Sequence, residues 1–300
     1  MLWLITALSA YLFFALGNLG DKFVLAGPPK PQGYTFWVAA GGLVSLLLVP
    51  FAVFFVPSSA ILAAIIIAGT SYILGLYFLY SALEDGEVSK IMPALGGFLA
   101  VFTLIISSIL FKTGDFFSLR NIIAFTFLFG GSMAAVWKRG SSFAKQNLKI
   151  VVLAAFFFAA NYNFSKVVFS GYPFLSGFIL MRIASFLAGF AIFARFALPE
   201  AFSSKPAFNK NNTGFFVLAQ TAGGAGFLLE SLAISLVSAA FLPFVVVLQG
   251  AQYLFLFFFS YSLSMKVKVF KENFSRRAVW QRILALILIV CGLLILAFVK

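Results

Sequence analysis

Long apolar stretches separated by short polar turns make up almost the whole chain. A membrane-spanning helix needs about 20 mostly apolar residues. On this rule the sequence predicts about ten of them, at 2–25, 34–55, 60–82, 88–111, 119–137, 149–170, 174–197, 214–236, 239–264 and 279–298. The segments between them are rich in glycine, proline, serine and charged residues, as expected of loops between packed helices. The pattern therefore predicts an all-α integral membrane protein without a soluble domain.

A sequence repeat divides these helices into two sets. Residues 13–29 read FFALGNLGDKFVLAGPP and residues 157–173 read FFAANYNFSKVVFSGYP, so that Lys22 aligns with Lys166. VSKIMP at 88–93 and VSAAFLP at 237–243 each open the fourth helix of a set. The repeat predicts two five-helix halves, 1–140 and 141–300, within one membrane domain. Because five is an odd number, the second half enters from the opposite face, which is the inverted-repeat plan of secondary transporters.

Composition excludes a soluble protein. The 300 residues are 63% hydrophobic and 10% charged, with a mean hydropathy of +1.08, whereas soluble domains are about 45–50% apolar and roughly 25% charged. In such a chain the net charge of +13 does not indicate nucleic-acid binding, because basic residues beside membrane spans fix orientation and contact anionic lipid. We expect a multi-pass protein of the cell (inner) membrane, with the lipid bilayer as a partner.

Several short motifs resemble the EamA repeat of the drug/metabolite transporter superfamily. The first helix of each half carries small or amide residues before a lysine, in GNLGDK and NYNFSK, and the fifth follows an acidic turn and closes on glycine. Arg182 matches an arginine of the family's second helix, where the first half has Val38. The turn before the fourth helix matches at Ala82, Ser89 and Pro93 and again at Ala233, Ser238 and Pro243. The resemblance implies ten helices in two inverted repeats and the export of small metabolites.

The chemistry of an enzyme is missing from the sequence. The chain has no histidine and one cysteine, Cys291, and of its eight acidic residues only Glu230 lies deep within a predicted span. A membrane enzyme needs a concentrated set of metal ligands, a nucleophile with its base, or paired carboxylates. There is also no glycine-rich phosphate-binding motif with its lysine. We therefore expect no catalytic residues, no cofactor and no metal.

Three charged residues inside predicted spans are candidates for function, because a charge at the bilayer centre costs about 2.5–3.5 kcal/mol on insertion scales. Lys22 and Lys166 either extend to the headgroups or face a shared cavity, and their recurrence supports the cavity. Glu230 either reaches water near its helix end or faces a cavity, where a carboxylate carries a proton or meets a cationic substrate. The acidic turn at 84–87 is interpreted as solvated loop charge.

Uncharged polar residues add further candidates on the helices that, by resemblance, line a central cavity. Amides and phenols bind polar substrates, but they also join helix to helix with about 0.6–2 kcal/mol each, and this structural role is the more frequent one for any single residue. Pro93 and Pro243 are interpreted as residues of a helix start. With Arg182 and the three charged residues above, the candidate substrate-binding residues are Asn18, Lys22, Tyr77, Tyr80, Asn161, Lys166, Arg182, Gln220, Glu230, Gln249, Gln252 and Tyr253.

These features predict a secondary transporter that exports small metabolites, such as amino acids or similar polar solutes, by alternating access. The cycle is either proton-coupled through Glu230 or uncoupled, and the protein acts as a monomer or a homodimer. The alternative is a flippase for a lipid or a lipid-linked sugar, which needs a cavity open sideways to the bilayer. A structural subunit is a third alternative, and the polar residues on the inner helices argue against it.

The basic residues are distributed unequally between the two predicted faces. With about ten spans, both termini lie on one face, which with its adjoining helices holds five of the 21 Lys and Arg residues: Lys112, Arg120, Lys166, Arg182 and Lys300. The other face takes the remaining 16: Lys22, Lys30, Lys90, Lys138, Arg139, Lys145, Lys149, Arg195, Lys205, Lys210, Lys266, Lys268, Lys271, Arg276, Arg277 and Arg282. Short basic loops stay cytoplasmic, so the charges place both termini outside, whereas the family resemblance implies cytoplasmic termini.

Overall fold

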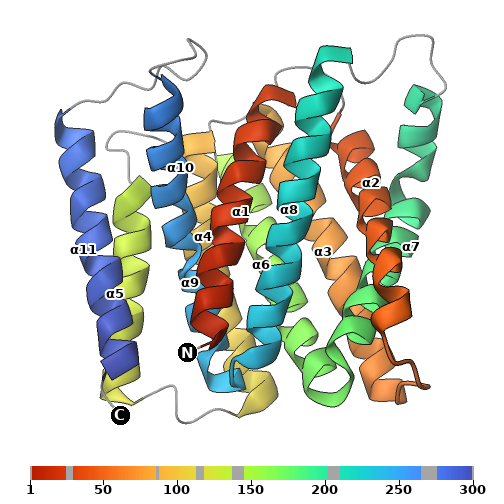
Figure 1. Cartoon of the computed structure of the whole chain (residues 1–300), viewed down its shortest axis with the longest axis horizontal. Helices are drawn as coiled ribbons and strands as arrows, with labels where there is room; N and C mark the ends of the chain where they lie inside the picture. Colours follow the sequence, from red (N-terminus) through yellow and green to blue (C-terminus); the bar gives the residue numbers. More distant parts are fainter. Residues whose placement is uncertain are drawn as a thin grey trace.

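In a computed structural model of the protein, residues 2–24, 30–85, 88–112, 118–136, 145–201, 210–264 and 276–298 are described, some of them without their side chains. Within these ranges the chain is almost wholly helical (Figure 1). The helices are α1 (Leu2–Val24), α2 (Pro31–Gly41), η1 (Gly42–Phe51), α3 (Ser59–Asp85), α4 (Val88–Phe111), α5 (Leu119–Val136), α6 (Lys145–Gly171), α7 (Phe174–Ala201), α8 (Lys210–Leu236), η3 (Ala239–Phe241), α9 (Leu242–Val247), α10 (Gln249–Ser264) and α11 (Arg276–Phe298).

The helices have the length and the outer surface of a membrane-spanning protein. Six helical stretches in the described part are long and apolar enough to cross a bilayer: Pro31–Phe51, Ser59–Glu84, Ala94–Phe111, Leu148–Gly171, Phe174–Pro199 and Val217–Leu236. Four shorter apolar helical stretches accompany them. Large apolar side chains such as Leu47, Phe51 and Leu119 are exposed, which suits a surface that faces lipid rather than water. These features indicate an α-helical membrane protein.

The helices stand side by side as one bundle, and α1 begins and α11 ends at the same end of it, the lower one in Figure 1. The most extensive packing joins α1 to α8, α3 to α6, and α5 to α11. Further contacts join α4 to α6, α1 to α10, and α2 to α7. Elements far apart in the sequence therefore meet throughout the bundle.

Glycines allow α1 and α8 to approach closely. A Cβ atom on Gly17 would lie 3.2 Å from the Ala219 carbonyl oxygen, and one on Gly226 would lie 3.1 Å from the Ala10 carbonyl oxygen. Backbone atoms cannot yield as a flexible side chain can, so small residues are required at this contact. The close contact brings α1, from Ala10 to Gly17, against the middle of α8.

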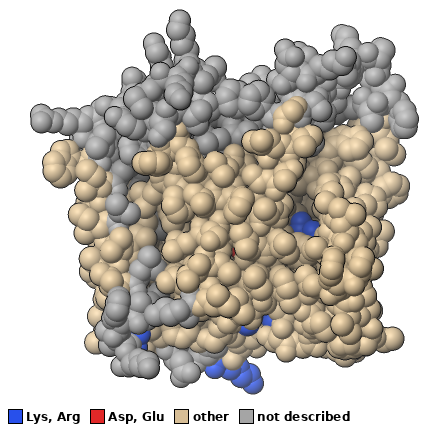
Figure 2. Space-filling view, in the orientation of Figure 1, with Lys and Arg blue, Asp and Glu red and all other residues tan. Residues whose placement is uncertain are grey.

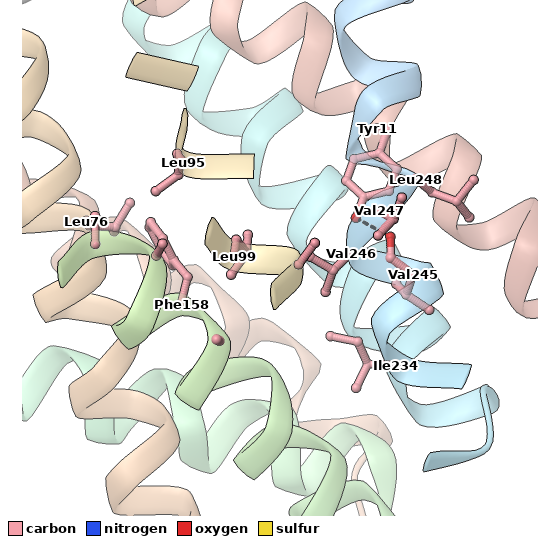
Figure 3. Packing of buried hydrophobic residues seen from close by; sticks show 14 of the residues in the cluster. Tyr11, Leu76, Leu95, Leu99, Phe158, Ile234, Val245, Val246, Val247 and Leu248 are labelled. Carbon is pink, nitrogen blue, oxygen red and sulfur yellow. Dashed lines mark hydrogen bonds between the residues drawn. The ribbon is translucent and has the colours of Figure 1, made fainter. Parts of the chain in front are cut away.

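The buried core lies where α4, α6 and α9 meet (Figure 3). Leu95 and Leu99 of α4 are almost completely buried, as are Val245 and Val246 of α9. Phe158 of α6 packs into the same cluster. Because these side chains leave little space, the central helices hold nearby polar residues in fixed positions.

Two of the predicted spans differ from a continuous α-helix. The span predicted at 34–55 is α2 followed by the 3-10 helix η1, which ends at Phe51, and residues 52–58 are not helical. Proline lacks the N–H of a regular helix, and Pro50 stands in the last turn of η1. The span predicted at 239–264 is divided into η3, α9 and α10, with Pro243 in the first turn of α9, as expected of a proline at a helix start.

Candidate functional site

Glu230 is a carboxylate buried among helices from both halves of the chain. Its side chain, on α8, is only 2% exposed, so the interpretation that it reaches water near the helix end is wrong. Its Oε1 accepts hydrogen bonds from the hydroxyl groups of Tyr11 on α1, at 3.2 Å, and Tyr162 on α6, at 3.0 Å. A buried carboxylate held by neutral donors can gain or lose a proton, or bind a cation, without breaking an ion pair.

Tyr11 also connects this carboxylate to the interrupted segment of the bundle. Its hydroxyl donates to the backbone carbonyl oxygen of Val245 at 2.7 Å (Figure 3). Val245 lies three residues before Leu248, where α9 gives way to α10. The last carbonyl groups of a helix need partners from outside it, and Tyr11 provides one. Glu230 and the Val245 carbonyl oxygen are therefore linked through Tyr11, whose hydroxyl has a single hydrogen for the two contacts.

Arg182 on α7 forms a second buried charged centre. It is 7% exposed, and its guanidinium carbon lies 4.2 Å from the centroid of the Tyr72 ring and 3.6 Å from that of Phe227. Its Nε has no hydrogen-bond partner, and no described acidic residue forms a salt bridge with it. Phe227 precedes Glu230 by three residues, so the same face of α8 carries both centres.

Gln220, Tyr34 and Tyr80 form a polar contact nearer the start of α8. The Gln220 side chain donates to the Tyr34 hydroxyl on α2 at 3.2 Å, and the ring of Tyr34 meets that of Tyr80 on α3 edge to face, with centroids 4.7 Å apart. Two of the candidate residues, Gln220 and Tyr80, thus share one partner. The contact joins α2, α3 and α8 above the charged centres.

Lys166 caps the end of α8. It is 6% exposed, and its ammonium group donates to the main-chain oxygens of Ser235, at 3.1 Å, and Val237. A cation at a helix C-terminus satisfies free carbonyl groups and interacts favourably with the helix dipole. Lys166 therefore does not extend to the headgroups, and two hydrogen bonds tie it to the backbone, one helical turn from Tyr162 along α6.

The remaining candidates are mostly structural or lie outside the described residues. Asn161 donates to the Ala68 carbonyl oxygen at 3.0 Å and so joins α6 to α3, and Tyr77 packs against Phe193. Gln252 is buried, and the buried Oε1 of Gln249 has no partner. The side chains of Asn18, Lys22 and Tyr253 lie outside the described part of the structure.

Four residues of the two centres were not among the candidate substrate-binding residues. Tyr72 and Phe227 lie against Arg182, and Tyr11 and Tyr162 bond to Glu230. Tyr11 carried a usable signal, because tyrosine favours the membrane interface and this one lies in the middle of the first apolar stretch. Phe227 carried little, since the chain contains 42 phenylalanines.

No metal site is formed by the described residues, in which no three His, Cys, Asp or Glu side chains gather. Chemically, the arrangement offers a carboxylate that can exchange a proton and a guanidinium that can accept an anion. The carboxylate lies on α8, the guanidinium of α7 packs against Phe227 on the same face of α8, and both groups are buried.

Comparison with known proteins gives a likeness of fold. No protein-family model matches the chain, and no curated protein matches it. One solved structure, described only as a crystal structure of a protein, has a TM-score of 0.69 at 13% sequence identity, with 98% of this chain and 95% of the other covered. At this identity the likeness concerns the fold alone, and it extends over almost the whole of both chains.

Proposed function

We propose that the protein is a secondary transporter that exports small polar metabolites, such as amino acids, by alternating access. The observation that carries this proposal is the environment of Glu230, where hydroxyl groups from α1 and α6 and an interrupted α9–α10 segment converge. A buried charge within a membrane bundle needs a partner or a function. Binding sites of secondary transporters lie at the interface of two repeats, beside interrupted helices.

The packing of the helices supports two inverted repeats, 1–140 and 141–300. If α1 corresponds to α6 and α3 to α8, the contact of α1 with α8 has its counterpart in the contact of α6 with α3. With α10 corresponding to α4, the contact of α1 with α10 has its counterpart in that of α6 with α4. Such matched contacts, in which a helix of each half packs against helices of the other half, are expected of a ten-helix, EamA-type transporter. We propose that the chain belongs to that group.

Transport assays with matched acidic variants test the proposal. Purified protein in proteoliposomes is screened for uptake of radiolabelled amino acids, nucleosides and sugars. Glu230→Gln, which removes the exchangeable proton, should lower transport at least about tenfold, in line with the loss of a general acid–base group. Glu84→Gln, an exposed carboxylate at the end of α3, should transport as the wild type does.

The pH dependence identifies the coupling. If Glu230 carries the coupled proton, wild-type transport changes between mildly acidic and neutral pH, and Glu230→Gln transport does not. Equal transport by the wild type and Glu230→Gln at every pH would remove Glu230 from the cycle. Transport by neither protein of any solute would contradict the proposed function.

One observation favours flipping of a lipid or lipid-linked sugar as the second candidate function. Figure 2 shows basic side-chain atoms in a hollow on the side of the bundle, between the positions of α8 and α2 in Figure 1. A cavity open to the side of a bundle faces acyl chains. If no water-soluble solute moves while a fluorescent lipid crosses between leaflets, this second function replaces the first.

A further inference from the structure

Arg182 is a buried cation whose Nε–H has no hydrogen-bond partner among the described residues. A guanidinium has five N–H donors in a planar fork, and leaving such a group unpaired away from water is costly. In this structure the side chain is 7% exposed, its Nε has no partner, and the described carboxylates form no salt bridge with it. The guanidinium therefore keeps one buried N–H group, at Nε, without an acceptor.

Aromatic rings compensate for only part of this cost. The guanidinium lies over the rings of Tyr72 and Phe227, and Phe178 is 5.8 Å away. A cation–π contact contributes about 0.5–2 kcal/mol, which is less than the cost of burying a charge. The rings of Tyr72 and Phe227 contact each other edge to face, with centroids 5.0 Å apart, so they pack against the guanidinium without enclosing it. This packing leaves the Nε–H without a partner.

Glu230 does not form a salt bridge with Arg182. The two residues are close enough for their charges to interact, but Oε1 of Glu230 is in contact with the hydroxyl groups of Tyr11 and Tyr162. Among the described residues, an ion pair is therefore not what holds Arg182 in the bundle. A molecule that enters the bundle can supply the acceptor that its Nε–H lacks.

Glycines beside open space occur on both α2 and α8. A Cβ atom added to Gly41 of α2, or to Gly223 or Gly224 of α8, would meet no other atom within 4 Å. Gly42, which caps α2, has the Arg182 side chain 3.4 Å from the position of its missing Cβ. The hollow of Figure 2, with its basic atoms, lies on the side of the bundle between these two helices.

We propose that Arg182 is the anion-binding residue of this site, where its guanidinium receives a carboxylate or phosphate group of a molecule that enters between α2 and α8. This inference rests on the proposed function and narrows its substrates to compounds with an oxyanion group. The planar fork of a guanidinium, here packed against the rings of Tyr72 and Phe227, suits two parallel hydrogen bonds to such a group. The same chemistry occurs in a soluble organic acid and in an anionic lipid headgroup.

Binding to the purified full chain, without transport, tests the inference. The protein is placed in phosphatidylcholine nanodiscs and titrated with phenylacetate and with phenylacetamide, which has a similar shape and no charge. Phenylacetate should bind at least about tenfold more tightly than phenylacetamide, as expected for charge-assisted hydrogen bonds. A second set of nanodiscs contains phosphatidylglycerol, and its effect on the melting temperature reports binding of the lipid headgroup.

Three variants separate Arg182 from general effects of charge. Arg182→Gln should lose the preference for phenylacetate, and Arg182→Lys, which keeps the charge without the fork, should retain part of it. Arg195→Gln is the matched control, because Arg195 is exposed on the same helix and its loss should leave binding unchanged. If Arg182→Gln does not fold, the wild type and Arg182→Lys still test the inference. The preference for phenylacetate over phenylacetamide should then be smaller in Arg182→Lys than in the wild type.

The outcomes are distinct from those of the transport assay. If phosphatidylglycerol raises the melting temperature of the wild type but not of Arg182→Gln, while phenylacetate does not bind, the result supports the anion site, with lipid as its ligand. Equal binding of both probes without a lipid effect, or an anion effect that persists in Arg182→Gln, overturns the inference. Anion binding at Arg182 in a protein that transports no solute would leave this inference standing and refute the transport function.

Discussion

At the scale of single residues, the hydroxyl of Tyr11 carries one hydrogen and lies near two acceptors. The Val245 carbonyl oxygen at 2.7 Å is nearer than Oε1 of Glu230 at 3.2 Å. If the hydrogen goes to Val245, the contact with Glu230 is a hydrogen bond only when the carboxyl group itself carries the proton and donates it to Tyr11. The protonation state of Glu230 is thereby linked to a bond that holds α1 to α9.

The first prediction compares the two tyrosines at this carboxylate. Tyr11→Phe removes partners from both Glu230 and Val245, whereas Tyr162→Phe removes one from Glu230. Hydrogen bonds between membrane helices contribute about 0.6–2 kcal/mol, so Tyr11→Phe should lower the free energy of unfolding by about 1–2 kcal/mol and Tyr162→Phe by less. Denaturant titrations of the two variants in detergent check the order. The reverse order would mean that Val245 does not depend on Tyr11.

The second prediction concerns Lys166. Lys166→Met removes the donors at the end of α8 while keeping the length of the side chain, and should lower the free energy of unfolding by roughly 1–3 kcal/mol. The binding of anionic probes should not change. Lys149→Met, an exposed lysine on the same helix, is the control for loss of charge and should be neutral. Loss of probe binding with unchanged stability would return Lys166 to the list of substrate-binding residues.

At the scale of elements, hydrophobic length predicted where the helices lie but not how two of them are interrupted. The ends of α4, α8 and α11 fall where the apolar stretches end, because a span is set by bilayer thickness. η1 ends beside Pro50, and α2 changes to η1 at Gly41–Gly42; the second change is one of backbone geometry, which a count of apolar residues does not detect. The turn at Leu248 has no glycine or proline of its own and was missed, although it positions Val245.

The third prediction uses two glycines with different surroundings. A Cβ on Gly69 of α3 would lie 2.8 Å from the backbone nitrogen of Ser185 and 2.9 Å from the Met181 oxygen of α7, whereas one on Gly224 would contact nothing within 4 Å. Gly69→Ala should therefore destabilise the protein by about 1–3 kcal/mol. Gly224→Ala should be neutral or stabilising by up to about 1 kcal/mol. Melting temperatures in detergent compare them, and equal shifts would contradict the close α3–α7 contact.

At the scale of the whole molecule, the sequence predicted more of the candidate residues than of their contacts. Glu230 and Arg182 could be identified because charges in apolar stretches are rare. Their partners could not, since Tyr11 and Glu230 are 219 residues apart and only tertiary packing brings them together. Lys166 was also identified from the sequence, but its surroundings were not. Its recurrence suggested a cavity, whereas its ammonium group donates to main-chain oxygens at the end of α8.

The last prediction concerns how the bundle is oriented in the membrane. α1 begins and α11 ends at the same end of the bundle (Figure 1), so one orientation fixes both termini. The predicted loops of the opposite face and their adjoining helices contain 16 of the 21 Lys and Arg residues. Translocating short basic loops is unfavourable, so that face should remain in the cytoplasm and the termini should lie outside, contrary to the expectation from the EamA resemblance.

Labelling single cysteines in intact cells tests this orientation. Lys145→Cys and Lys271→Cys, each in a Cys291→Ser background, place a thiol on the basic face. A maleimide that does not cross membranes should leave both thiols unmodified until the cells are opened, because the charges hold this face inside. Modification in intact cells would mean that another force outweighs a difference of 16 to five basic residues. The first helices of the chain, which often dominate insertion, would then be the next part of the chain to test for an effect on orientation.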